Sequence, residues 1–304
     1  MNAIPISHPD LWPELPLAAW QDTYATLHMW TQIVGKVRLA LSPRMNQWWE
    51  VALYVNARGL TTSPIPYEHC IFEIQFDFID HTLTIQTDRR ESRTLALKPR
   101  SVADFYREFM SALDALGIRV KIWKMPCEIA NPIPFDQDTQ HASYDPDYAN
   151  RFWRILVASD TLLKEFRAEF IGKSSPVHFF WGSFDLAVTR FSGRRAPERV
   201  GADPITREAY SQEVISCGFW PGGGDVKEAA YYAYAAPEPE GFARREVKPP
   251  EAYYDTQMKE FLLPYEAVRI ATSPHDALIS FAQSTYEAGA DLGKWPRQDL
   301  ERTA

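Results

Sequence analysis

The N-terminal region carries its apolar residues at helical spacing. Leu17, Trp20, Tyr24 and Leu27 recur at intervals of three and four residues. This spacing places them on one face of a helix, which predicts a helix over residues 16–34. Gly35 follows directly, and a glycine is common just past the end of a helix. We therefore expect this helix to end there.

The pattern then changes to the period of two that is typical of strands. Strands are predicted at 37–42 and 47–58, and the segment 70–87 predicts a hairpin whose apolar side chains all point to one face. A further strand is expected near 93–99. Ser101 and Asp104 are spaced as a helix N-cap and its third residue, which predicts a helix to about residue 116. The last strand of this region is expected at 119–125.

A connector rich in proline and aspartate follows and separates two halves. We place the halves at 1–125 and 146–304, with the connector at 126–145. The second half predicts a helix over 146–171, several strands, and a final helix that begins after the N-cap Ser273.

The two halves repeat the same order of elements. "IVGK" at 33–36 resembles "FIGK" at 170–173, and "WEVALYVNAR" at 49–58 resembles "WGSFDLAVTR" at 181–190. The predicted fold class is therefore α+β: two related helix–antiparallel sheet–helix halves around a pseudo-twofold axis. A cleft between such halves is a common place for a ligand.

Composition narrows the range of partners. The chain has 304 residues, 45 % of them hydrophobic, and a formal net charge of −8. No basic stripe is present, which disfavours nucleic-acid binding. No apolar run is long enough to cross a bilayer, and the first residues lack the pattern of a signal peptide. The odd count of three cysteines, without paired spacing, argues against a disulfide framework and favours the cytoplasm.

The stretch "SPVHFFWGSFDLAVTRFSGR" at 175–194 predicts one long buried strand. It carries four ionisable residues, and buried charges are costly unless they are paired. Alternation places Asp185 on one face and both His178 and Arg190 on the other, unless Gly182 forms a bulge. The first half has Leu53 where the second has Asp185, so Asp185 is an addition to one half.

The leading hypothesis is a protein that binds a small polar or anionic molecule between its halves, or an enzyme acting on one. His178 would be a general base, with Asp185 orienting it or binding substrate. The ligand would be held by His141, Tyr144, Trp181, Arg190 and Arg194. In the alternative, structural interpretation, the same groups form a buried network in which each polar side chain has a hydrogen-bond or ion-pair partner. The sequence names no cofactor.

Two other functions remain open. An interaction protein would form a homodimer through exposed aromatic side chains. A metal-dependent enzyme would use His141, His178 and Asp185, although no local pair of ligands supports this.

Tyr24, His28 and Gln32 are spaced by four residues on the first helix. These polar and aromatic side chains could line a pocket, but the structural interpretation, a buried, hydrogen-bonded histidine at a seam between helix and sheet, is favoured.

Long motifs link the chain to a family. "ARGLTTSPIPY", "HASYDPDYANRFW" and "PVHFFWGSFDLAVTRFSGR" resemble an uncharacterised bacterial family, a domain of unknown function, from Leu11 to about Trp295. The resemblance implies a soluble bacterial protein of a single chain. It implies no activity, cofactor or catalytic residue.

Overall fold

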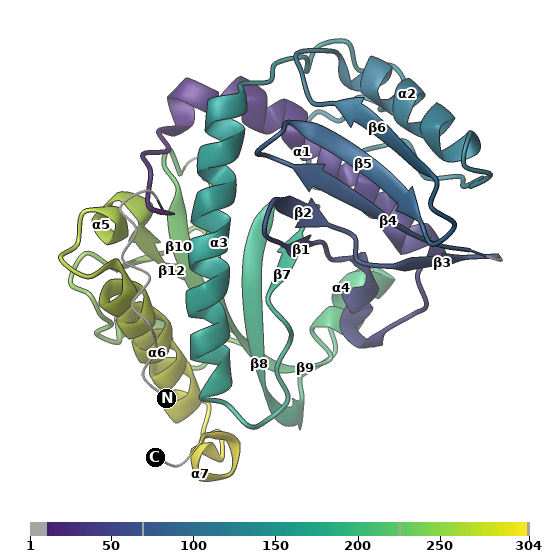
Figure 1. The fold of residues 1–304 in the computed structure, drawn as a ribbon. Helices are drawn as coiled ribbons and strands as arrows, with labels where there is room; N and C mark the ends of the chain where they lie inside the picture. Colours follow the sequence, from purple (N-terminus) through teal and green to yellow (C-terminus); the bar gives the residue numbers. More distant parts are fainter. Residues whose placement is uncertain (1–10, 69, 225, 303–304) are drawn as a thin grey trace.

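The computed structural model describes residues 11–68, 70–224 and 226–302. The first ten residues, for which the sequence predicts no signal peptide, lie outside this part. Within it, helices and two antiparallel sheets form an α+β fold (Figure 1). None of the helices in these ranges has the length and apolar character needed to span a bilayer.

The first half consists of a long helix, a six-stranded sheet and a second helix. The sheet has the order β1-β2-β4-β5-β6, with β3 also paired to β4. The elements are α1 (Leu17–Leu41), η2 (Asn46–Val51), β1 (Tyr54–Val55), β2 (Gly59–Thr61), β3 (Ile65–Tyr67), β4 (Cys70–Asp77), β5 (Thr82–Thr87), β6 (Ser92–Ala96) and α2 (Val102–Asp114).

The second half also contains a six-stranded sheet, in the order β11-β12-β10-β9-β8-β7. Its elements are α3 (Pro146–Ala168), β7 (His178–Phe180), β8 (Asp185–Arg195), α4 (Pro204–Ala209), β9 (Gln212–Trp220), β10 (Ala230–Ala236), η3 (Phe242–Arg244), β11 (Tyr253–Asp255), β12 (Glu260–Pro264), α5 (Tyr265–Arg269), α6 (Pro274–Leu292) and α7 (Arg297–Leu300).

The two sheets meet edge to edge. Leu53 and Phe179 exchange both backbone hydrogen bonds, each at 2.9 Å, and this joins the edge beside β1 to β7. Helix α3 packs against β1 as well as against β8 and β9, and it stands beside both sheets in Figure 1. The halves thus share one core. Their pseudo-twofold relation and the boundaries at 125 and 146 stay predictions.

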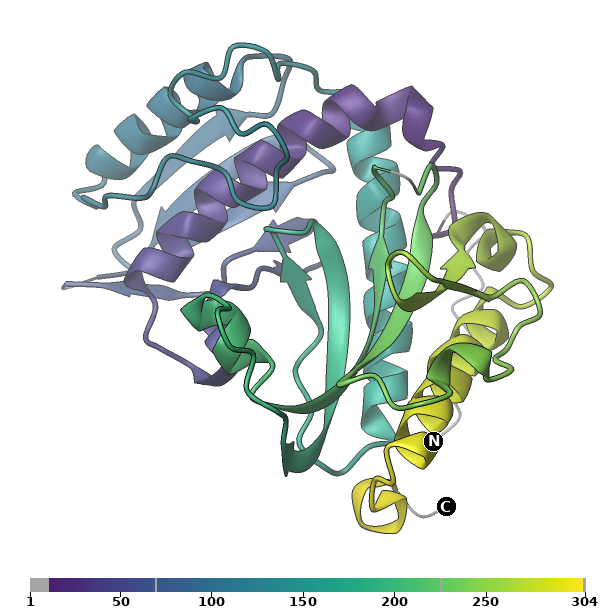
Figure 2. The same ribbon diagram turned by 180° about the vertical axis from the view of Figure 1, so that it is seen from behind.

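The first sheet buries one face, whereas the central strands β8 and β9 of the second sheet are buried on both faces. In the predicted hairpin β4–β5, the alternate residues Phe72, Ile74 and Phe76 are buried in the core. The two helices of the first half also meet in this core, where the ring of Trp30 in α1 stacks on that of Phe105 in α2 with centroids 4.7 Å apart. Helices α3 and α6 pack on the second sheet. Its other face is turned toward the viewer in Figure 2, where α1 passes over one end and α4 lies at the other.

Three predictions of local structure were wrong. Helix α1 continues through Gly35 to Leu41, so the strand expected at 37–42 does not form. The segment 47–58 contains the short helix η2 and only the two residues of β1, and 119–125 is neither helix nor strand. Gly35 lies inside the helix and does not end it. The residue is glycine because the indole ring of Trp181 packs against its Cα, where a Cβ atom would overlap the ring.

We expect Gly35→Ala to destabilise the protein by about 1–3 kcal/mol, the usual cost of overpacking a core. Helix propensity alone would give the opposite sign, because alanine is favoured over glycine inside a helix. Chemical denaturation of the variant measures the loss. The double variant Gly35→Ala, Trp181→Leu should lose less than the sum of the two single changes. Additive losses would mean that the clash is not the cause.

Candidate functional site

The stretch 175–194, predicted as one strand, is a hairpin. Residues 181–184 form a turn between β7 and β8, and Phe184 takes a left-handed backbone conformation with φ of 61°. His178 pairs with Ala187 and Phe180 with Asp185, so both ionisable residues lie on the same face of the sheet. The turn thus corrects the predicted alternation. Arg190 lies on the opposite face.

Helix α1 fixes this turn through the side chains predicted to share one of its faces. His28 donates from Nε2 to the carbonyl oxygen of Gly182 at 2.8 Å, and Gln32 binds the backbone of Cys127. Trp181 donates its indole N–H to the carbonyl of Val51 at 2.6 Å. Burial lowers the pKa of His28 to about 4. His28 is therefore the buried, hydrogen-bonded histidine of a helix–sheet seam.

Asp185 opens β8 and is only 6 % exposed. Its carboxylate accepts hydrogen bonds from the hydroxyls of Ser183 and Tyr232. Tyr232 lies two strands away on β10, and Gly218 of β9 pairs with it. A side chain at Gly218 would collide with the Tyr232 phenol. This glycine therefore gives the phenol room to cross β9 and reach Asp185.

Two further carboxylates interact with Asp185. Burial, with repulsion from Asp185, raises the pKa of Glu128 in the connector. Burial and the charges of Asp185 and Asp255 raise the pKa of Glu260 on β12 to about 7. Burial also raises the pKa of Asp185 itself, against the two hydroxyl hydrogen bonds that lower it.

We call Glu128, Asp185, Tyr232, Tyr234 and Glu260 the carboxylate–tyrosine cluster. The rings of Tyr232 and Tyr234 stack at 6.2 Å with 12° between their planes. None of the described lysines or arginines is among the groups that shift the pKa of its three carboxyls. In the described part of the chain, the cluster therefore combines acidic groups with aromatic rings.

His178 lies in an aromatic environment and exposes none of its surface. The rings around it are those of Trp49, Tyr54 and Phe180, with centroids 5.3–5.7 Å away. Neither ring nitrogen has a hydrogen-bond partner in the described residues. Burial and the charges of Arg38 and Arg167 lower its pKa to about 3. Because a substrate cannot reach the ring here, the geometry does not favour a general base.

The two arginines proposed to hold an anion lie elsewhere. Arg190 is enclosed by the rings of Phe166, Tyr286 and Phe170, at 3.5, 4.3 and 5.1 Å, on the face covered by α3 and α6. Arg194 binds Glu213 and the carbonyl oxygens of Gly293 and Lys294 at the end of α6. Neither joins Asp185.

The remaining predicted residues lie beside α1 and the first sheet. Tyr144 is buried against Trp30, and its hydroxyl is 2.9 Å from Nδ1 of His81. His141 lines a surface hollow of about 440 Å³ between α1 and the connector. The predicted site is thus divided among several places.

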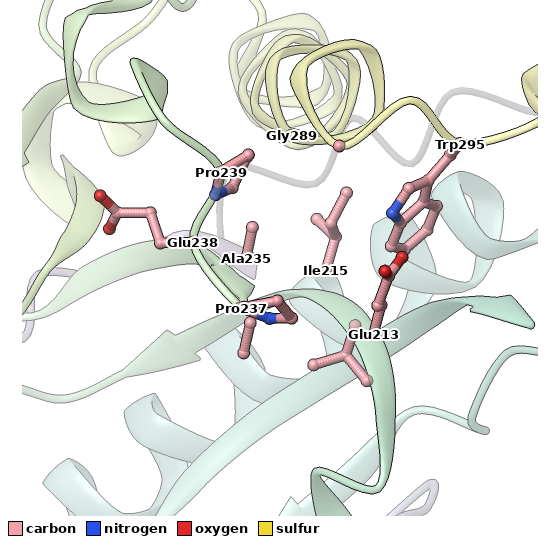
Figure 3. A pocket seen from close by; sticks show the side chains of 11 residues that line it. Glu213, Ile215, Ala235, Pro237, Glu238, Pro239, Gly289 and Trp295 are labelled. Carbon is pink, nitrogen blue, oxygen red and sulfur yellow. The ribbon is translucent and has the colours of Figure 1, made fainter. Parts of the chain in front are cut away.

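Another hollow lies between the ends of β9 and β10 and helix α6 (Figure 3). Its volume of about 100 Å³ is small beside the roughly 300–1,000 Å³ of ligand pockets. Figure 3 shows the carboxylates of Glu213 and Glu238 on opposite sides of it. Glu213 already pairs with Arg194, and Glu238 accepts a hydrogen bond from Tyr254. We do not place a site there.

The described residues give the metal alternative no support. The described part of the chain contains no group of three His, Cys, Asp or Glu side chains placed to bind an ion. His141, His178 and Asp185 therefore do not form the predicted triad.

Sequence reasoning missed the partners of Asp185. Tyr232 and Tyr234 stand at alternate positions of "AYYAYAA", which places them on one face of a strand. Gly218 interrupts the apolar strand "ISCGFW", a position that marks close approach by another group. Both signals were readable. Glu128 and Glu260 carried no local signal, because only the tertiary fold brings them to Asp185.

Comparison with known proteins assigns this chain to a family. Residues 12–302 match a family of unknown function, DUF5996. The chain belongs to that family. The match confirms the resemblance found in the sequence, which likewise covered nearly the whole chain. No curated protein and no solved structure matches the chain.

Proposed function

We propose that this protein binds a small organic cation at the carboxylate–tyrosine cluster. The observation that supports this most directly is the set of three electrostatically coupled carboxyls on Glu128, Asp185 and Glu260, each with a raised pKa. Repulsion between such groups is relieved when a positive charge enters. A bound cation would therefore lower their pKa values and gain affinity from doing so.

The rings favour an organic cation over a bare proton or metal ion. Tyr232 and Tyr234 are half-buried and stacked, and aromatic faces attract ammonium groups. The sequence led us to expect an anionic or polar ligand held by arginines. With Arg190 and Arg194 bound elsewhere, the groups left beside Asp185 are acidic, which changes the expected charge of the ligand. The homodimer hypothesis stays a prediction without a specific contact to support it.

Titration calorimetry with choline and putrescine tests the proposal. We expect both to bind, and we expect Asp185→Asn and Glu260→Gln each to weaken binding at least about tenfold, or 1.4 kcal/mol. Glu198→Gln, which removes an exposed charge elsewhere, should bind as the wild type does. Equal binding by all four proteins, or no binding at all, would refute the proposal.

The pH dependence gives a second test. The pKa of Glu260 is raised to about 7, so its carboxyl is increasingly protonated below neutrality. Choline keeps its charge at every pH, and its affinity should therefore rise between pH 6 and 8. Glu260→Gln should flatten this dependence. An affinity for choline that falls over the same range would contradict the assignment.

A further inference from the structure

We infer that His141 and Asp138 form a proton-transfer site for a small polar molecule in the hollow beside α1. This site is separate from the carboxylate–tyrosine cluster and does not depend on the function proposed for it. The hollow of about 440 Å³ is lined by Gln21, Asp22, Ala25, Gln140, His141, Ala142 and Ser143. Its volume lies within the usual range for small-molecule sites.

The carboxylate of Asp138 holds the imidazole of His141 in one orientation. Asp138 is 1 % exposed. Its Oδ2 lies 2.6 Å from Nδ1 of His141, and its Oδ1 accepts the backbone N–H groups of Gln140 and His141 at 3.0 and 3.1 Å. Because a carboxylate accepts, the proton of the neutral ring belongs on Nδ1. The Nε2 atom is left as the acceptor.

The loop that carries the pair is anchored at several points. The carbonyl oxygens of Asp138 and His141 accept N–H groups from Ala103 and Val102, in the first turn of α2, at 2.9 and 3.0 Å. On the other side, the N–H of Ser143 donates to Oγ1 of Thr26 in α1 at 3.1 Å. The loop that carries the imidazole is therefore anchored to two helices, which is the support that a precise proton acceptor needs.

The other described histidines lack this combination. His28 and His178 are buried, and His81 binds Tyr144. His275 makes a useful contrast, since it also contacts carboxylates, those of Glu165 and Asp276. Those carboxylates are 43 % and 79 % exposed, against 1 % for Asp138, and His275 lines neither hollow described above.

The lining indicates the class of substrate. Gln21, Gln140 and Ser143 offer amide and hydroxyl groups, and Asp22 is acidic. No lysine or arginine is among the residues that line this hollow. A neutral or basic molecule rich in hydrogen-bonding groups fits such a surface, and an anionic one does not. His141 would accept a proton from a substrate hydroxyl or from an attacking water, and Asp138 would stabilise the imidazolium that forms.

The probe p-nitrophenyl acetate, an uncharged ester, makes this chemistry measurable. Nε2 of His141 takes a proton from water, and the water oxygen forms a bond to the acyl carbon. The ester bond then breaks, and p-nitrophenolate leaves with its electron pair. The other product is acetic acid, which ionises to acetate in solution, and the proton on His141 also returns to solvent. We expect the wild type to release p-nitrophenolate faster than the buffer does.

Three variants decide the role of the pair. His141→Gln should lower the enzyme-dependent rate at least tenfold, because it removes the proton acceptor. The ring is partly exposed, so its loss should not unfold the chain. Asp138→Asn should lower kcat with little change in KM. His275→Gln is the matched control and should keep the wild-type rate. A folded His141→Gln protein with the wild-type rate would overturn the proposal, as would an equal loss in His275→Gln.

The tautomer of His141 gives a test that needs no activity. Nitrogen NMR of the labelled wild type should show the proton of the neutral ring on Nδ1, with Nε2 unprotonated. This readout also separates positioning by Asp138 from a merely structural role, because Asp138→Asn should change the tautomer. A wild-type ring protonated on Nε2 would overturn the proposal even if Asp138→Asn fails to fold.

Discussion

Replacing Arg190 with alanine is expected to lower the free energy of unfolding by about 3–5 kcal/mol. Arg190 is 1 % exposed, and its guanidinium packs against the rings of Phe166, Phe170 and Tyr286. It also donates to the carbonyl oxygen of Phe166 near the C-terminal end of α3, where a positive charge is favourable. Alanine would leave a cavity and a carbonyl group without its partner.

The charge of Arg190 is retained in the fold. Burial lowers its pKa to about 10, which is still well above neutrality. Arg190→Met keeps most of the apolar stem, so it should cost less than Arg190→Ala. Denaturant titration with an unchanged m-value would assign the difference to stability rather than to the denatured state.

Arg58 provides the matched control, since the predicted repeat would align it with Arg190. Its side chain is 42 % exposed and pairs with the exposed Asp80 and with Asp77, which is buried but also accepts the backbone N–H groups of Ile79 and Asp80. Because its guanidinium is partly in solvent and Asp77 keeps these other donors, Arg58→Ala should cost clearly less than Arg190→Ala, and its effect should depend on salt. If Arg58→Ala and Arg190→Ala proved equally destabilising, burial of the guanidinium would not be the deciding factor.

Replacing His178 with leucine should make the protein more resistant to acid. The folded state holds the pKa of His178 at about 3, below the ordinary value of 6.5. Below pH 6.5 the unfolded chain therefore binds a proton that the folded chain does not, and stability is lost as the pH falls. The loss approaches about 1.4 kcal/mol per pH unit, or roughly 3 kcal/mol by pH 4.

Leucine at position 178 removes this pH-dependent loss of stability. It also removes two ring nitrogens that have no hydrogen-bond partner in the described residues. The variant should be at least as stable as the wild type at pH 7, and its advantage should grow toward pH 4. Unfolding of both proteins at several pH values measures this. The difference between them isolates His178 from carboxyls such as Glu260, whose raised pKa acts in the opposite direction. A constant difference across the range would contradict a buried neutral imidazole.

Features set by neighbours in the chain were predictable from the sequence. The hairpin β4–β5 follows from strict alternation of apolar residues, and the N-caps Ser101 and Ser273 begin α2 and α6 as expected. Gly35 shows where such reasoning fails. Its place after an apolar helical face is typical of a C-cap, yet the residue is glycine because Trp181, far along the chain, packs against it. A local pattern does not contain that contact.

The residues of the candidate site were likewise only partly predictable from the sequence. Asp185 was identified because a carboxylate stood among apolar strand residues, and it lies in the carboxylate–tyrosine cluster. Arg190 met the same criterion, but it is enclosed by aromatic rings on the other face of the sheet. The turn at 181–184 decides which polar residues share a face. Its left-handed residue is Phe184, a type that gives no sign of such a turn.

The join between the sheets bears on how the chain could be divided. Helix α1 belongs to the first half by sequence, yet His28 and Gly35 contact Gly182 and Trp181 in the second. Helix α3 belongs to the second half, yet it packs against β1. Fragments cut at the connector would each carry an unpaired strand edge, a template for aggregation. Each fragment should therefore aggregate when it is produced alone and remain soluble when the two are produced together, because they are complementary parts of one folding unit.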